Sequence, residues 1–143
     1  MKNKGFTLIE LLAVIVILAI IALIATPIII GMIDDARSSA KERSAELVYT
    51  GVQYAYTSSL YAGTEGASLP EVTLSSIKDN LTIDNMKEAK LDSESNPTKL
   101  TIQTDDGVYC DVKVSGKSFS VDCRAGEDES SKSLLTKTIA ATK

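Results

Sequence analysis

The chain has 143 residues and a formal net charge of −4, and it contains two cysteines, no histidine and no tryptophan. This length allows one domain at most. The lack of histidine removes the commonest metal ligand and the commonest general acid or base near neutral pH, so we expect no enzyme, no cofactor and no metal site. The acidic balance and the 5% aromatic content argue against direct nucleic-acid binding, which needs concentrated basic surface and stacking rings.

A long apolar segment follows the first residues. Residues 11–33 carry no charge, and fifteen consecutive apolar residues run from Leu11 to Ala25. About 20 helical residues, each rising about 1.5 Å, cross a hydrocarbon layer of about 30 Å. Two lysines precede the segment and two aspartates follow it, so the positive-inside rule places the N-terminus in the cytoplasm. We therefore predict a transmembrane helix over residues 6–33.

An acid, Glu10, stands near the start of this apolar helix. An ionised carboxylate costs up to about 3 kcal/mol at mid-membrane, so its presence here marks a functional candidate. The alternative is a side chain that extends to the nearby interface and has no further role. An ordinary secretory signal peptide fits badly, because its apolar stretch is shorter and closes on a small-residue cleavage site.

Lys4 to Glu10 read Lys-Gly-Phe-Thr-Leu-Ile-Glu. This motif, with the apolar helix behind it, resembles the processing signal and N-terminal helix of type IV pilins and related pseudopilins. The resemblance implies that a prepilin peptidase removes residues 1–5 by cutting after Gly5 and then methylates the new terminus at Phe6. It also implies a homo-oligomeric helical filament, assembled from the cytoplasmic membrane by an inner-membrane platform protein and an assembly ATPase.

The resemblance gives Glu10 a partner. Cutting at Gly5 would expose the amine of Phe6, which is mostly a cation at neutral pH. A carboxylate buried among packed helices needs an opposite charge, since an unpaired buried charge costs several kcal/mol. In the resembling family this acid is thought to pair with the N-terminus of an adjacent subunit and to set the axial stagger. A pair between Glu10 and the amine of its own chain remains open.

Pro27 and Gly31 predict a kink or break in the helix. Proline removes one backbone hydrogen bond and clashes with the preceding turn, at a cost of about 3 kcal/mol, and glycine weakens the turn that follows. The resemblance implies that residues 19–27 lose helical structure in a filament, which would lengthen the subunit. The alternative is a fixed kink in the membrane with no role in a filament.

Residues 34–62 predict an amphipathic helix with two apolar stripes. We expect its earlier half to pack against other helices, its later half to dock on a globular domain, and Gly63 and Gly66 to end it. The first stripe consists of Ile33, Ala36, Ala40, Leu47, Gly51, Tyr54 and Tyr61, and the second of Ala45, Tyr49, Val52, Tyr56 and Leu60.

Residues 98–124 alternate apolar and polar residues over three segments, as the strands of an antiparallel meander do. A three-residue loop at Asp105–Gly107 would set Ile102 opposite Cys110. A two-residue turn at Gly116 and Lys117 would set Cys110 opposite Cys123, which predicts a disulfide between them rather than a redox or metal site. Two reduced, buried thiols are the alternative. The apolar face of this sheet needs a cover, and the helix provides one, so we expect an α+β fold: a long N-terminal α-helix on a small antiparallel β-sheet, as in type IV pilins.

Two regions are less informative. Residues 63–97 predict a variable loop with a short strand and a helical turn near Asn85 to Ala89, and the resemblance implies that this loop faces outward. Residues 125–143 are acidic and polar, so a solvated C-terminal tail is our first interpretation and a docked final strand the second.

These features predict an assembling structural subunit. We expect a major-type pilin of a type IV pilus, which would reside in the cytoplasmic membrane before assembly and in a cell-surface filament afterwards, serving adhesion, motility or aggregation. One alternative is a pseudopilin of a type II secretion or competence DNA-uptake system. An alternative of another class is a monomeric, signal-anchored extracellular binding domain.

Overall fold

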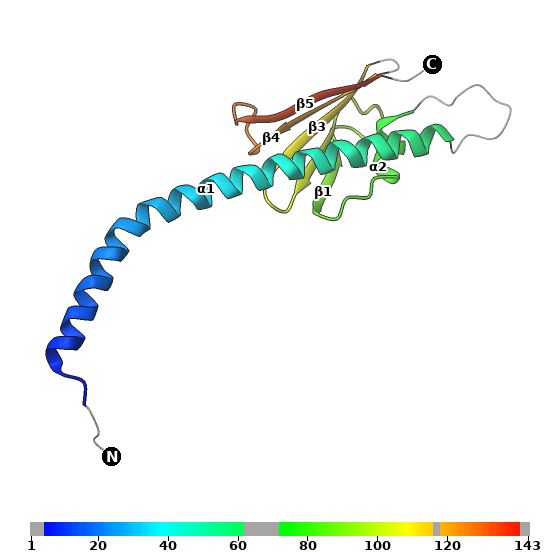
Figure 1. The fold of residues 1–143 in the computed structure, drawn as a ribbon. Coiled ribbons are helices and arrows are strands. Elements are labelled where there is room, and N and C mark those ends of the chain that lie inside the picture. Colours follow the sequence, from blue (N-terminus) through cyan, green and yellow to red (C-terminus); the bar gives the residue numbers. More distant parts are fainter. Residues whose placement is uncertain (1–4, 62–71, 116–117, 141–143) are drawn as a thin grey trace. The chain divides into compact units, whose positions relative to one another are not determined.

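The computed structural model describes residues 5–61, 72–115 and 118–140. These residues form two compact units, Met1–Ser38 and Ser39–Lys143, which we describe separately. The elements, shown in Figure 1, are α1 (Leu8–Tyr61), α2 (Leu74–Asp79), β1 (Met86–Leu91), β2 (Leu100–Thr104), β3 (Tyr109–Ser115), β4 (Ser118–Arg124) and β5 (Ser133–Ala140).

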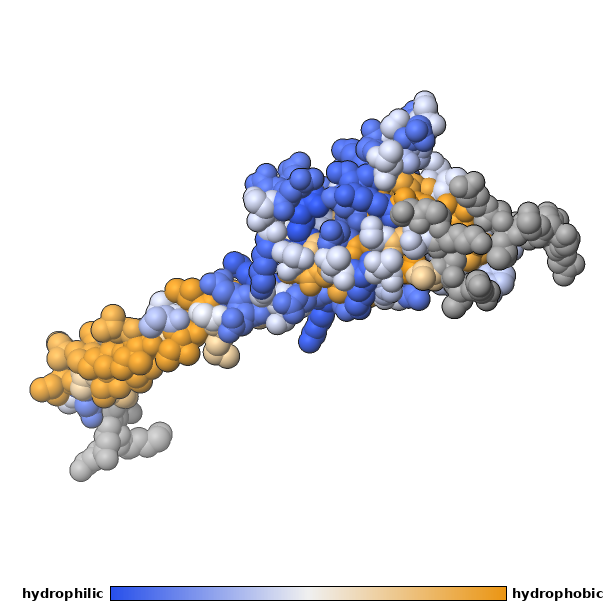
Figure 2. Space-filling model, turned by 90° about the horizontal axis from the view of Figure 1, so that it is seen from above, coloured by the Kyte–Doolittle hydropathy of each residue, from blue (hydrophilic) through white to orange (hydrophobic). Residues whose placement is uncertain are grey.

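The first unit contains the apolar part of α1. This part is long and apolar enough to cross a membrane, by length and composition, and none of its most apolar window is buried inside the protein. Figure 2 shows the apolar residues of this unit as a continuous surface. Such a surface is unstable in water, so it must be covered by lipid or by other protein.

At Pro27 and Gly31, where we predict a kink or break, α1 is a continuous α-helix, so it is not broken at either residue, and a kink stays a prediction. Pro27 cannot donate to the carbonyl of Leu23, but one missing hydrogen bond leaves the bonds on either side intact. In the turn before Pro27, the Thr26 hydroxyl donates to the Ala22 carbonyl at 2.7 Å. The isolated chain therefore keeps its helix here, and melting of residues 19–27 in a filament stays a prediction.

The second unit is an antiparallel sheet of five strands in the order β1-β2-β3-β4-β5, with α1 across one face (Figure 1). The predicted register is confirmed: Ile102 lies opposite Cys110, and Cys110 lies opposite Cys123. The loop between β2 and β3 is the predicted three-residue loop, in which Gly107 adopts a positive φ of 80° that favours glycine. The predicted turn at Gly116 and Lys117 lies outside the described residues.

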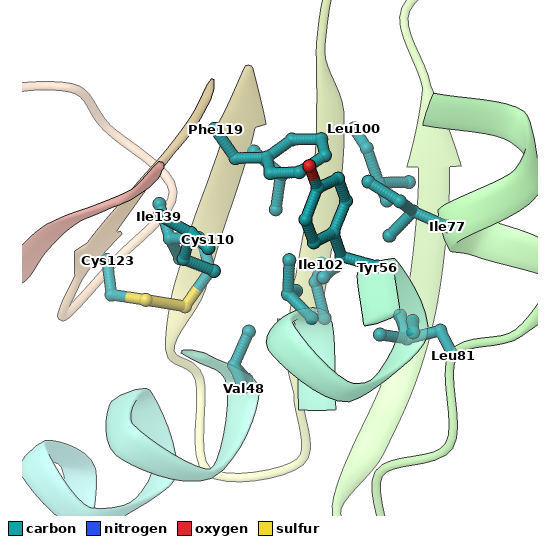
Figure 3. Packing of buried hydrophobic residues seen from close by; sticks show 14 of the residues in the cluster. Val48, Tyr56, Ile77, Leu81, Leu100, Ile102, Cys110, Phe119, Cys123 and Ile139 are labelled. Atoms are coloured by element: carbon teal, nitrogen blue, oxygen red, sulfur yellow. A yellow bond between two sulfur atoms is a disulfide. The ribbon is translucent and has the colours of Figure 1, made fainter. Parts of the chain in front are cut away.

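The α1 residues that dock on the sheet come mainly from the second predicted stripe. Ala45, Val52 and Tyr56 are buried, and the Tyr56 ring meets Phe119 edge-on with ring centroids 4.3 Å apart (Figure 3). The first stripe faces away from the sheet, since Tyr54 remains 69% exposed. Burial of apolar side chains between α1 and the sheet is therefore the main force that holds this unit together.

A polar cluster marks where α1 first becomes buried. Ser44, the first buried residue of the helix, donates from its hydroxyl to Asp106 Oδ2 in the β2–β3 loop at 2.7 Å. Asn85 Nδ2 donates to the Ser44 hydroxyl at 3.0 Å, and the Thr104 hydroxyl donates to Asp106 Oδ1. Burial alone would raise the pKa of Asp106, but the hydrogen bonds from Thr104 and Ser44 hold it below its usual value. The cluster ties the helix to one end of the sheet.

The structure corrects two predictions made from the sequence. Residues 133–140 are not a solvated tail: they form β5, which pairs with β4 and places Leu135 and Ile139 on the core side, as our second interpretation had it. The helical turn expected near Asn85 to Ala89 is wrong, because these residues enter β1 and pair with β2. The helix of this region is α2, which begins with a capping box at Thr73 and Ser76.

Candidate functional site

The predicted cleavage point lies immediately before α1. Gly5, Phe6 and Thr7 are non-helical, and α1 begins at Leu8. Among the described residues, no atom lies within 4 Å of a Cβ placed on Gly5, and Phe6 is 82% exposed. A peptidase needs an accessible backbone outside a helix, and a glycine lets it approach closely. The bond between Gly5 and Phe6 meets both requirements.

Glu10 closes the start of the helix through a capping box with Thr7. Its Oε2 accepts a hydrogen bond from the Thr7 backbone N–H at 2.9 Å and one from the Thr7 hydroxyl at 2.7 Å. In return, the Glu10 N–H donates to Thr7 Oγ1 at 3.4 Å. The first N–H groups of a helix have no partner in the helix itself, and leaving them unpaired in lipid costs several kcal/mol. Glu10 therefore has a partner within its own chain.

This cap uses one oxygen of the carboxylate. Within the part of the chain that the structure describes, Glu10 Oε1 accepts no hydrogen bond. The other oxygen is therefore available to a further donor. Sequence reasoning identified Glu10 but missed Thr7, although Thr-x-x-Glu before an apolar run is itself the pattern of a capping box.

The predicted disulfide is confirmed in the second unit. Cys110 on β3 and Cys123 on β4 form an S–S bond, and both residues lie on the core side of the sheet, nearly inaccessible to solvent (Figure 3). Seven residue pairs between β3 and β4 already fix the register of the two strands, so the disulfide stabilises an existing pairing. Among the described residues, no group of three or more cysteine, aspartate or glutamate side chains could hold a metal ion.

The opposite face of the sheet carries a partly buried ion pair. Asp111, with a side chain only 7% exposed, accepts from Arg124 at 2.6 Å and from the Thr101 hydroxyl at 2.7 Å, and Lys99 Nζ lies 3.8 Å away. Burial would raise the pKa of Asp111, but the hydrogen bonds from Arg124 and Thr101 and the nearby positive charges hold it below its usual value. These partners satisfy Asp111 internally, which indicates a structural rather than a catalytic group.

The comparisons agree with the N-terminal geometry. A family model described as the prokaryotic N-terminal methylation motif matches residues 1–26. Searches of curated proteins and of solved structures give no match. The matched segment contains Gly5, Phe6 and Glu10, and together with the apolar helix it indicates a membrane-anchored substrate of a prepilin peptidase. Through this motif and its α+β fold, with one long helix on an antiparallel sheet, the chain shows the signature of the type IV pilin and prepilin-like family.

Proposed function

We propose that this chain is the major-type structural subunit of a type IV pilus. Processing would cut the chain between Gly5 and Phe6 and methylate the new terminus. The apolar helix would then leave the membrane and bundle with the helices of other copies. The sheet-bearing unit would form the outer surface, which could serve adhesion, motility or aggregation.

The observation that carries this proposal is the half-used carboxylate of Glu10. Thr7 occupies Oε2, while Oε1 accepts no hydrogen bond from any described residue. Once the helix enters a bundle, a carboxylate with an unused oxygen needs a cation, and the amine on Phe6 of a neighbouring copy provides one. The pair would form at one axial offset only, so it would also set the stagger between subunits.

The apolar surface of α1 supports the same proposal. In the part of α1 before Asp34, the large apolar side chains are exposed on every side of the helix rather than on one face. A helix that is apolar all round is suited to a membrane or to the interior of a helical bundle. The subunit requires both environments in turn, first the lipid and then the filament core.

Assembly would need partners of known classes. A prepilin peptidase would process the chain in the membrane, and a platform protein with an assembly ATPase would extract it.

A pseudopilin of a secretion or DNA-uptake system remains the second candidate, because the methylation motif supports both equally. Electron microscopy of material sheared from native cells distinguishes them. Long fibres that consist of this chain, with methylated Phe6 as the N-terminus, support the major pilin. Short or absent fibres with the same processed terminus support the pseudopilin. An intact Met1 or Lys2 terminus would contradict both and favour a monomeric anchored domain.

A further inference from the structure

The sheet has two edges, and they are protected differently. At one edge, β1 carries three charged side chains and an irregular register between Met86 and Glu88. At the other edge, β5 is eight residues long and contains a single charged residue, Lys137. Among the described residues β5 pairs only with β4, so its outer row of backbone N–H and C=O groups is a template for another strand.

Lys137 lies on the core side of β5. It pairs with the buried Val121 on β4, and the neighbouring core-side residues of its own strand are the apolar Leu135 and Ile139. Because side chains alternate along a strand, Lys137 shares their face and stands where an apolar residue would extend the core.

The charged end of Lys137 avoids full burial by pairing with Glu46, an exposed residue of α1. Its Nζ lies 2.8 Å and 2.9 Å from the two carboxylate oxygens of Glu46 on α1, and 4.8 Å from the centre of the Tyr49 ring. The Lys137 side chain remains 42% exposed and that of Glu46 52% exposed. The stem therefore covers apolar surface while the ion pair stays in contact with water.

We propose that Lys137 prevents β5 from pairing with the β5 strand of a second copy. A strand added at this edge would cover the side from which the Lys137–Glu46 pair meets water. Removing water from an ion pair is unfavourable unless new partners replace it. A row of backbone hydrogen bonds would form only at the expense of that solvation.

The register of such a pairing leaves no favourable place for Lys137. Antiparallel pairing that keeps both core faces on the same side, centred on residue 137, sets Lys137 opposite Lys137 of the other copy. Sliding the strands by two residues sets it opposite Leu135 or Ile139 instead. Directly opposed like charges are destabilising, and the other registers place an ammonium against an apolar residue. The exclusion therefore holds in each of these registers.

This inference goes beyond the proposed filament function and does not depend on it. The second units of different copies, which we call heads, would meet at their sheet edges on a crowded membrane whether or not the copies assemble. By closing β5 to other copies, Lys137 leaves the exposed surface of α1 as the route for self-association.

The experiment uses the full chain in detergent with Lys137→Leu. Sedimentation measures association, and hydrogen exchange reports whether the outward amides of β5 become protected. The unchanged chain under the same conditions supplies the association that comes from α1. We expect the variant to associate at about tenfold lower concentration or less, with new protection confined to β5. Unchanged sedimentation and unchanged exchange in a folded variant would overturn the proposal.

Two matched variants keep the result specific. Thr138→Leu adds the same side chain on the opposite face of β5, and we expect no protection of the outward amides of β5. Equal association of both leucine variants would indicate non-specific hydrophobic association and would overturn the proposal. Glu46→Gln removes the ion pair but keeps the ammonium, so we expect lower thermal stability with an unpaired edge. Association of Glu46→Gln to the same degree as Lys137→Leu would overturn it as well. If Lys137→Leu fails to fold, Lys137→Met keeps a long stem without the charge.

Discussion

Gly51 allows α1 to lie against the segment before β1, and replacing it with alanine tests the docking of the helix. A Cβ at this position would lie 2.6 Å from Ile83 Cγ1 and 3.0 Å from Ile83 Cδ1, which is closer than carbon atoms normally approach. Alanine is a better helix former than glycine by about 1 kcal/mol. Overpacking costs about 1–3 kcal/mol, so steric repulsion should exceed the gain in helix propensity. We expect Gly51→Ala to destabilise the head by about 1 kcal/mol.

The assay is urea unfolding of the full chain in detergent, followed by near-ultraviolet circular dichroism of the tyrosines in the head. The matched experiment repeats the substitution in an Ile83→Ala background, where the clashing atoms are gone. There Gly51→Ala should stabilise the head by up to about 1 kcal/mol, which gives a coupling of about 2 kcal/mol between the two sites. A neutral or stabilising effect in the presence of Ile83 would refute this packing of α1 on the head.

Three further predictions concern the sheet. Arg124→Leu leaves the nearly buried Asp111 without its closest cation, so we expect a loss of about 3 kcal/mol in urea unfolding, with Lys113→Leu as an exposed control that should change little. The pKa of Asp111 is lower in the folded than in the unfolded chain, so its contribution to the free energy of unfolding is present above about pH 4 and is lost as the pH falls through the folded pKa. Asp111→Asn should flatten that part of the pH–stability curve, and an unchanged slope would contradict the assignment. The buried disulfide should resist reductant in the folded chain, which should gain the mass of two hydrogens only after unfolding, and rapid reduction of the native chain would count against its burial. Removal of the disulfide in a Cys110→Ala, Cys123→Ala double variant should lower the free energy of unfolding by about 2–4 kcal/mol.

The register of the central strands β2, β3 and β4 could be predicted from the sequence because only one alignment of their residues places the core residues opposite one another. Alternation assigns the aliphatic residues, Phe119 and both cysteines of β2 to β4 to one face, and the two turns then leave one register that matches apolar with apolar. The cysteines provide an independent check, since only this register sets Cys110 opposite Cys123.

The strand β5 could not be predicted with the same certainty, and the reason is Lys137. A charged residue at a core-side position interrupts the apolar alternation between Leu135 and Ile139, so the segment looks like a polar tail. The position is favourable only because Glu46 lies on α1, 91 residues away along the chain. A contact over such a separation leaves no local pattern in the sequence.

The candidate site shows the same division. Gly5, Phe6 and Glu10 could be identified as candidate site residues from the seven residues Lys4 to Glu10. Recognition by a peptidase and insertion into a membrane both depend on a short, continuous stretch of sequence. The role of Thr7 depends on the geometry of the first helical turn, where its N–H and hydroxyl meet Glu10 Oε2. Because a charged residue in an apolar helix suggests a partner on another chain, Thr7, three residues before Glu10, was not considered.

The most direct test of the account uses Glu10→Gln subunits co-expressed with unchanged subunits in the native cells. Glutamine at this position preserves the capping box with Thr7 but removes the charge, so the variant separates the local cap from pairing between subunits. Mass spectrometry of processed N-terminal peptides would compare the filament with the membrane pool, with Glu42→Gln on the same helix as the control. We predict that Glu10→Gln subunits are depleted from filaments by about tenfold or more, while Glu42→Gln subunits enter normally. Incorporation of Glu10→Gln subunits in proportion to their abundance in the membrane would contradict the account.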